Sequence, residues 1–220
     1  AYSDLEGDLP SSVVKLRKLV DFIIGSTKVT GQLPGALGEM TSLRILTIYN
    51  TFVDGEIPTS ICQLTDLEEL NLGKNKLVGI LPVCIGDMKR LRSLLLEDNR
   101  LFGYEISLIS LRPIPESISN LTKLKFLTLN TLNAISSTNL FSGSLPLGMA
   151  KLLLLEKLYV NVQTLSGPLP TIYAAIDLDD CDLTLGDYCR YWNSPDRSSA
   201  TTTCDFESVP KCNSDCMVLY

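Results

Sequence analysis

The stretch 70-LNLGKNKLVGILP-82 contains the pattern that decides the fold of this chain. It ends in a Leu-Pro pair, and Leu/Ile-Pro pairs recur along the sequence, with their prolines at Pro10, Pro34, Pro58, Pro82, Pro115, Pro146 and Pro170. The first four prolines are 24 residues apart. Counted from each proline, apolar residues occupy offsets +6, +9, +12 and +14 in six consecutive units; at +12 they are Phe22, Leu46, Leu70, Leu94, Leu127 and Leu158. A repeat of this kind indicates structural units that stack on one another.

The spacing within a unit predicts a short return segment and then a strand. Offsets +6 and +9 are three apart and suit one turn of a 3-10 or α segment. Offsets +12 and +14 point to one face of a strand, while +11, +13 and +15 point to the other. No unit can bury its leucines alone, so the units should stack into a curved, right-handed solenoid with a concave parallel β-sheet and a 3-10 or irregular convex side. We expect glycine to turn the chain after each strand and proline to begin the next coil.

These units resemble the plant-type leucine-rich repeat, LxLxxNxLxGxIP, from about Leu5 to Leu183. The resemblance implies an α/β solenoid that belongs to an extracellular receptor ectodomain or to a secreted recognition protein. Ligands of such proteins bind the concave face or its flank, although the scaffold carries many unrelated binding roles. We predict a solenoid at 1–183, with six full units and partial units at its ends, and a cysteine-rich cap at 184–220.

The resemblance also implies a buried asparagine that repeats from unit to unit. It stands at Asn75, Asn99 and Asn139, and is replaced in other units by Thr27, Thr51 and Gln163. Each of these side chains can satisfy a backbone group in a turn. We therefore interpret them as structural residues rather than as a binding array.

Two units are longer than the others, with insertions near 104–112 and 130–138. Both follow a strand on consecutive coils, so they should lie side by side on one edge of the solenoid. They are either tolerated variation in loop length or a paired protrusion that contacts a partner. The first insertion is too apolar to be left loose in water, so we expect it to pack against something.

The first residues form only the tail of a repeat, without the cysteine pair that similar proteins place at this end. Terminal repeats need a polar cover. We expect a missing N-terminal segment, with disordered sequence or another subunit as the alternative covers.

Composition narrows the function. Among 220 residues, 25 acidic side chains outnumber 19 basic ones and give a net charge of −6, which argues against nucleic acid and anionic membranes as partners. The chain has no histidine, which excludes a Ser–His–Asp triad, a Cys–His pair and a histidine-ligated zinc. We expect no enzyme activity, cofactor or metal. No apolar run reaches the ~18–20 residues of a membrane span, and the first residues lack signal-peptide features, as a mature secreted protein would.

Seven cysteines are spread unevenly. Cys62 and Cys84 lie on the return segments of adjacent coils, where we expect buried free thiols. The others crowd the end, at Cys181, Cys189, Cys204, Cys212 and Cys216, and predict a disulfide-stapled cap in an oxidising compartment. Chain proximity favours the pairs Cys181–Cys189 and Cys204–Cys212, and leaves Cys216 free or paired between chains. A Cys₄ zinc site is disfavoured because no CxxC pair occurs. We place the last strand in 176–183, with Cys181 in the position of the repeated asparagine.

The candidate binding residues face outward from the concave strands, at offsets +13 and +15. They are Tyr49, Asn71, Glu97, Thr128 and Tyr159. Tyrosine gives contact area with a polar handle, which suits protein or peptide recognition, although the same positions could simply be solvated. Alternating aspartates in 177–182 could hold Ca²⁺, but a solvated acidic end is the commoner outcome. The sequon Asn120-Leu-Thr predicts a glycosylation site at Asn120.

Two functions of different class follow. The first is a non-catalytic extracellular or cell-surface recognition module that binds a protein, peptide or glycan through the concave face and the edge insertions. The second is a structural cell-surface or filament-forming protein that assembles through its solenoid ends or an intermolecular disulfide. The insertions and the mixed concave face favour the first, while the unclosed end and the odd cysteine count favour the second.

Overall fold

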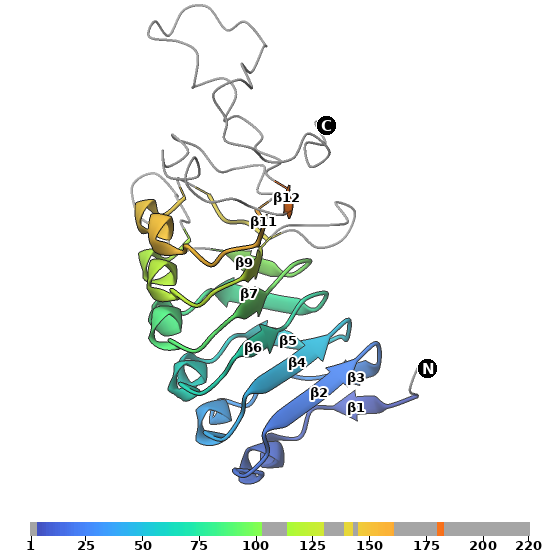
Figure 1. Ribbon diagram of the computed structural model, residues 1–220. Coiled ribbons are helices and arrows are strands. Elements are labelled where there is room, and N and C mark those ends of the chain that lie inside the picture. Colours follow the sequence, from blue (N-terminus) through green and yellow to red (C-terminus); the bar gives the residue numbers. More distant parts are fainter. Residues whose placement is uncertain (1–3, 103–113, 130–138, 143–144, 161–179, 183–220) are drawn as a thin grey trace, which may run out of the picture.

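A computed structural model describes residues 4–102, 114–129, 139–142, 145–160 and 180–182. The chain winds into stacked coils, and each coil contributes a strand to a concave sheet and a short 3-10 helix to the opposite side (Figure 1). The concave strands are β2 (Asp21–Gly25), β4 (Ile45–Tyr49), β6 (Glu69–Asn71), β8 (Ser93–Leu95), β10 (Phe126–Thr128), β11 (Lys157–Tyr159) and β12 (Asp180–Asp182). The 3-10 helices are η1 (Ser11–Lys15), η2 (Leu37–Glu39), η3 (Thr59–Gln63), η4 (Val83–Asp87), η5 (Glu116–Asn120) and η6 (Leu147–Lys151).

The concave sheet has the register that the repeat predicts. Its seven parallel strands follow the order β12-β11-β10-β8-β6-β4-β2. The +12 residues stand opposite one another across it, in the pairs Phe22–Leu46, Leu46–Leu70, Leu70–Leu94, Leu94–Leu127 and Leu127–Leu158. The predicted solenoid with a parallel sheet and 3-10 segments is confirmed.

The register of the last strand was predicted wrongly. In β12, Cys181 stands opposite Leu158, and Asp180 and Asp182 flank it opposite Lys157 and Tyr159. Cys181 therefore occupies the +12 position rather than that of the repeated asparagine. Counted from its proline, the last unit reaches its strand one residue earlier than the other units do. Our prediction aligned the apolar residues from position 176 with the repeat and did not detect this difference.

The core is the stack of residues at the four apolar offsets. In β4 the burial alternates strictly, with Leu46 and Ile48 fully buried between partly exposed neighbours. The first coil differs because nothing among the described residues packs on its outer side. There Leu16 is 52% exposed, and Phe22 and Ile24 are only partly buried.

Asparagine side chains hold successive coils together, as predicted. Asn75 accepts a hydrogen bond from the Thr51 amide and donates to the carbonyls of Ile48 and Leu72. Asn99 and Asn139 donate to the equivalent carbonyls in the next coils, but they accept from the amides of Leu77 and Leu101. All three asparagines are buried.

The residues that replace this asparagine behave unequally. The Thr51 hydroxyl donates to Asn75, so this threonine extends the ladder. The buried hydroxyl of Thr27 has no hydrogen-bond partner among the described residues, so the expectation that it satisfies a turn is wrong. Gln163 lies outside the described residues.

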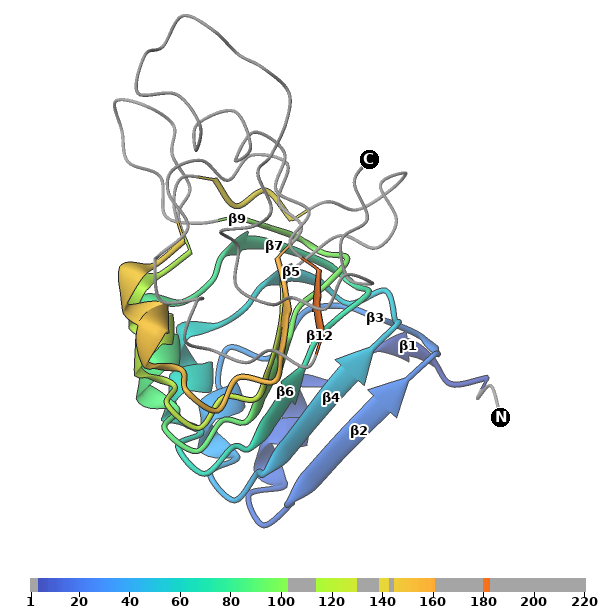
Figure 2. The same cartoon turned by 45° about the horizontal axis from the view of Figure 1, so that its top comes forward.

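A second sheet, absent from the sequence prediction, lines the side of the solenoid next to the concave sheet (Figure 2). It consists of β5 (Asp54–Glu56), β7 (Lys76–Ile80) and β9 (Arg100–Phe102), and a pair formed by β1 (Glu6–Asp8) and β3 (Lys28–Thr30) precedes it. The repeat glycines lie inside these strands, with φ of +74° at Gly55 and +82° at Gly79. We expected these glycines to make the turn after the concave strand, and this expectation is wrong. That turn uses left-handed residues at Ser26, Asn50, Lys74 and Asp98.

The 3-10 helices pack closely from coil to coil. A Cβ on Gly86 would lie 2.1 Å from the carbonyl oxygen of Ser117 in the next coil. A disulfide joins Cys62 on η3 to Cys84 on η4, with 5.8 Å between their Cα atoms. The expectation of two free thiols is therefore wrong, because stacking brings the different offsets of these cysteines within bridging distance.

Several predictions fall outside the described residues. They are the insertions at 104–112 and 130–138 and the cap at 184–220 with Cys189, Cys204, Cys212 and Cys216. In the described ranges, no helix has the length and apolar character needed to cross a membrane.

Candidate functional site

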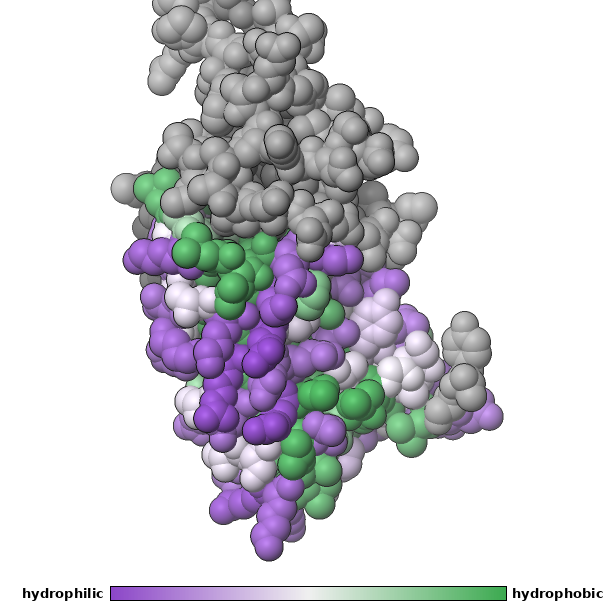
Figure 3. All heavy atoms as spheres, viewed as in Figure 1, coloured by the Kyte–Doolittle hydropathy of each residue, from purple (hydrophilic) through white to green (hydrophobic). Residues whose placement is uncertain are grey.

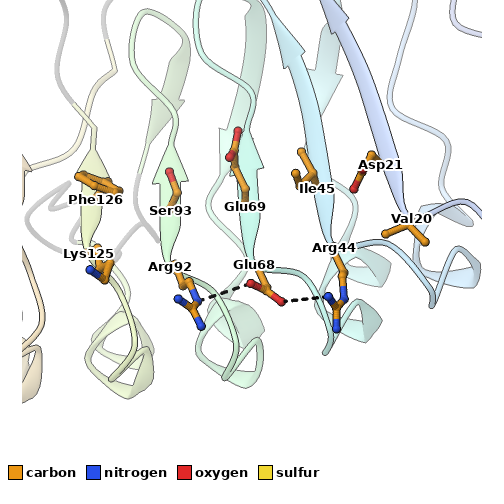
Figure 4. A pocket seen from close by; sticks show the side chains of 10 residues that line it. All are labelled: Val20, Asp21, Arg44, Ile45, Glu68, Glu69, Arg92, Ser93, Lys125 and Phe126. Carbon is orange, nitrogen blue, oxygen red and sulfur yellow. Dashed lines mark ion pairs between the residues drawn. The ribbon is translucent and has the colours of Figure 1, made fainter.

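The hollow of the concave face lies at the amino-terminal ends of its strands. We call it the basal groove; it has a volume of about 510 Å³ and crosses the strands from β2 to β10. Its side chains form two rows, one just before the strands and one at their first residues (Figure 4). The lower row, at offset +10, is Val20, Arg44, Glu68, Arg92 and Lys125; the upper row, at +11, is Asp21, Ile45, Glu69, Ser93 and Phe126.

The backbone holds the lower row in fixed register. The carbonyl of Val20 accepts hydrogen bonds from two consecutive amides of the next coil, those of Arg44 and Ile45. The carbonyls of Arg44, Glu68, Arg92 and Lys125 each repeat this double acceptance. Neighbouring side chains of the row are therefore set about one strand spacing apart, ~4.8 Å, before any ligand arrives.

Arg44, Glu68 and Arg92 alternate in charge along this row and are only loosely paired. Glu68 lies between two guanidinium groups, 3.9 Å from Nη1 of Arg44 and 3.5 Å from Nε of Arg92. Both distances exceed the usual length of a charge-assisted hydrogen bond. Both arginine side chains are 56% exposed, and each carries five N–H donors. Most of these donors therefore have no protein acceptor among the described residues.

The upper row varies more in character. Thr47 donates a hydrogen bond to Glu69, which holds that carboxylate over β4 and β6. Ile45 is apolar, and Ser93 and Phe126 carry no charge. In the space-filling view, hydrophilic side chains gather over the amino-terminal ends of the strands, and a hydrophobic patch lies beside them over the first coils (Figure 3). The groove thus offers hydrogen bonds, charge and apolar area together.

Tyr49, one of the predicted binding residues, ends β4 above the groove and is half-buried. The ammonium of Lys74 lies 5.4 Å from the centre of its ring. The pKa of Lys74 is raised from its ordinary value, mainly by a hydrogen bond with Tyr49, which opposes the lowering by burial. The charges of Tyr49, Asp98 and Glu97 add smaller upward contributions. Tyr49 is therefore held in place by a neighbouring coil.

Glu97, which we expected to face outward as a candidate binding residue, is largely covered. It is only 8% exposed, and its Oε2 accepts a hydrogen bond from Thr128, 2.6 Å away. The carboxylate lies flat over Gly73, where a Cβ would approach its Oε1 to 2.5 Å. Glycine at this point of the concave face leaves the space that Glu97 fills.

The remaining predicted residues lie further along the same face. Asn71 is half-buried and accepts a hydrogen bond from the Gly73 amide. Tyr159 on β11 stands opposite Thr128 on β10. The structure thus brings Glu97, Thr128 and Tyr159 together on adjacent coils, and leaves Tyr49 at the other side of the sheet.

The sequence interpretation missed the basal groove itself. It considered offsets +13 and +15, whereas the groove is built from +10 and +11. Reading the +10 offset down the units gives Val20, Arg44, Glu68, Arg92, Lys125 and Glu156, a charged column that could have identified the site.

Two other features concern modification and metals. Asn120 is the exposed last residue of η5, on the helical side and away from the groove; its glycosylation stays a prediction. No cluster of three or more potential metal ligands occurs within the described ranges.

Comparisons with known proteins agree with this fold. A family model for the leucine-rich repeat matches residues 55–101. A search among curated proteins finds no match. The fold is therefore a leucine-rich repeat solenoid, and similar solved structures include ectodomains of plant receptors.

Three of those structures illustrate the likeness. The ectodomain of the Arabidopsis receptor kinase HAESA, in complex with an extended IDA peptide hormone, has a TM-score of 0.71 at 23% identity, over 82% of this chain and 28% of that one. A TDR receptor has a TM-score of 0.61 at 26% identity, over 84% and 33%. The BIR3–SERK2 complex from Arabidopsis thaliana has 0.50 at 30% identity, over 61% and 63%. The chain thus spans a third or less of the first two structures.

Proposed function

We propose that this chain is a non-catalytic, extracellular recognition module that binds a protein or peptide across its concave face. The basal groove is the observation that carries the proposal. It is preformed by backbone hydrogen bonds, it is open, and its arginines retain unused donors. Rigid sites of this kind lose little entropy on binding.

Other features support the proposal. The solved structure of HAESA contains a peptide hormone, and BIR3 and SERK2 form a complex of two proteins. The disulfide between Cys62 and Cys84 suits an oxidising, extracellular compartment. A neutral glycan would leave the charged groups of the groove without partners, so a peptide or a protein segment fits it better.

The test is selection of displayed random peptides on the immobilised chain, followed by binding assays on variants. Arg92→Ala and Phe126→Ala should weaken the selected peptides. Arg90→Ala is the matched control: Arg90 pairs with Asp66 on the preceding coil, as Arg92 pairs with Glu68, but it lies outside the groove. Equal losses for Arg90→Ala and Arg92→Ala, or no loss for either groove variant, would overturn the proposal.

Two of the binding residues predicted from the sequence, Tyr49 and Tyr159, have a place in the same test. Tyr49→Ala and Tyr159→Ala should weaken binding if the peptide extends up the concave face, because a tyrosine at the centre of an interface often contributes ~2 kcal/mol or more. Normal binding by both variants would confine the site to the basal groove.

A second candidate function is assembly through the first coil. Leu16 is 52% exposed and Ile23 is 64% exposed, next to the outer edge of β2. No described residue pairs with this edge of β2, and apolar side chains beside an unpaired strand edge favour association. Sedimentation over a range of concentrations, with and without reductant, tests this: Ile23→Lys should disperse any assembly, and a chain that stays monomeric throughout refutes it.

A further inference from the structure

We infer that the basal groove selects an extended peptide that carries an acidic side chain over β8 and β10 and a basic side chain over β2 to β6. The inference rests on the proposed function and adds the charge pattern and direction of the ligand. It follows from the uneven distribution of charge along the two rows.

The end of the groove at β8 and β10 is cationic. Arg92 and Lys125 are neighbours in the lower row, since the Arg92 carbonyl accepts the Lys125 amide. Their acidic partners lie on the far sides of the pair: Lys125 forms a close ion pair with Glu156, whereas Arg92 is only loosely paired with Glu68, 3.5 Å away, and supplies most of the unpaired positive charge. No acidic side chain lines the groove between these two cations.

The residues above this pair add apolar contact without charge. Phe126 offers a half-buried ring, and Ser93 lines the groove but is itself buried, with 9% of its surface exposed. A ligand carboxylate can take the N–H donors that the long Arg92–Glu68 contact leaves unused, since guanidinium groups bind carboxylates through paired donors.

The other end of the groove has the opposite character. Asp21 and Glu69 line the upper row there, and Glu68 lies below them. Arg44 is the one cation among the lining residues at this end, 3.9 Å from Glu68. A ligand lysine or arginine can place its ammonium or guanidinium between these carboxylates.

Apolar side chains complete that end. Ile45 stands between Asp21 and Glu69 in the upper row, and Val20 begins the lower row. Long basic side chains bury their methylene stems on such surfaces and keep their charge at the polar rim. The same carboxylates would repel a polyanionic glycan, so the pattern favours a peptide with both charges.

Strand spacing sets the distance between the two charges of the ligand. Adjacent strands lie ~4.8 Å apart, and the centres of the two ends are about two and a half spacings apart, so the charges should be separated by ~12 Å. An extended chain covers this distance with roughly four residues at ~3.3 Å each. The peptide therefore runs across the strands, and the positions of its acidic and basic side chains determine which of the two possible directions it takes.

The test is selection of displayed random peptides of about eight residues, enough to cross the groove, on four forms of the chain. The native chain should select peptides with an acidic residue and, roughly four positions away, a basic one. Arg92→Gln with Lys125→Gln should remove the acidic preference and keep the basic one. Asp21→Asn with Glu69→Gln should do the reverse.

The control is Arg90→Gln, which removes a paired arginine of the same coil and should leave both preferences intact. Native-selected peptides should bind each double variant at least about tenfold more weakly, as expected for loss of a hydrogen bond to a charged group. Equal melting temperatures show that the variants keep the fold.

The remaining outcomes separate the two claims. If the selected peptides lack this charge pattern but lose binding on Phe126→Ala, the proposed function stands and the inference is wrong. If no peptide is retained, or binding ignores every groove substitution, both fail.

Discussion

Replacement of Asn99 by leucine tests the contact that fixes the coils relative to one another. Leucine has a similar size, so the fully buried site stays filled while its hydrogen bonds are lost. The side-chain oxygen of Asn99 accepts the amide of Leu77 at 3.0 Å, and its nitrogen donates to the carbonyls of Leu72 and Leu96 at 2.9 and 3.2 Å.

Two of these three backbone groups keep another hydrogen-bond partner when Asn99 is replaced. The Leu72 carbonyl also accepts from Asn75, and the Leu96 carbonyl also accepts from Asn139, so both retain a donor. The amide of Leu77 has no second acceptor among the described contacts. Asn99→Leu therefore strands one buried N–H, which costs about 1–3 kcal/mol of unfolding free energy.

The assay is urea unfolding, followed by far-ultraviolet circular dichroism. For a loss of about 2 kcal/mol and a slope of about 2 kcal/mol per molar urea, the midpoint should fall by about 1 M. The amide of Leu77 should also lose its protection from hydrogen exchange more than amides two coils away. The control is Asn120→Leu at an exposed site, where the change should stay within about 0.5 kcal/mol.

Two results would refute this reasoning. One is a loss for Asn99→Leu no larger than that for the control. The other is unchanged exchange at Leu77 despite a loss of stability, because the cost would then arise elsewhere.

Three further predictions concern other parts of the solenoid. Unreduced protein should yield a peptide pair joined through Cys62 and Cys84, and replacing both by alanine should cost up to about 3 kcal/mol for a bridge across 22 residues; two free thiols in the digest would contradict the fold. Gly86→Ala should cost about 1–3 kcal/mol, because a methyl group there meets backbone of the next coil, and an unchanged melting temperature would show that this approach is not close. Tyr49→Phe should lower the pKa of Lys74, followed by NMR titration. Folding raises the pKa of Lys74, so the charged lysine stabilises the fold at pH values below the ordinary lysine pKa. This stabilisation disappears as the pH rises through the raised pKa. A stability difference between the variant and the native chain that is found only at high pH would contradict the assignment.

The stacking of the coils could be predicted because apolar residues recur at fixed offsets along the sequence. Apolar residues at +12 recur in six consecutive units, and strand geometry then determines which residues face the core, as Leu46 and Ile48 do in β4. Asn75 and Asn99 were predictable for the same reason. The second sheet was not, because Asp54–Glu56 and its neighbours have little strand character and pair only through the stacking itself.

The candidate site was predicted only in part. The choice of the concave face was reasonable, but outward orientation does not determine exposure: Glu97 folds over Gly73 and is covered. The disulfide was missed because Cys62 and Cys84 have different offsets, and only the packing of η3 on η4 brings them together. The groove was missed because it combines two offsets, each of which looks like ordinary surface in any single unit.

The central claim is that ligands lie in the basal groove, and photo-cross-linking tests it most directly. A peptide selected on the native chain is synthesised with a photoreactive diazirine residue at its centre, irradiated in complex, and mapped by mass spectrometry. The account predicts cross-links to Ile45, Ser93 or Phe126, at the first residues of β4, β8 and β10. Cross-links confined to the 3-10 helices, the second sheet or the insertion at 104–112 would contradict it.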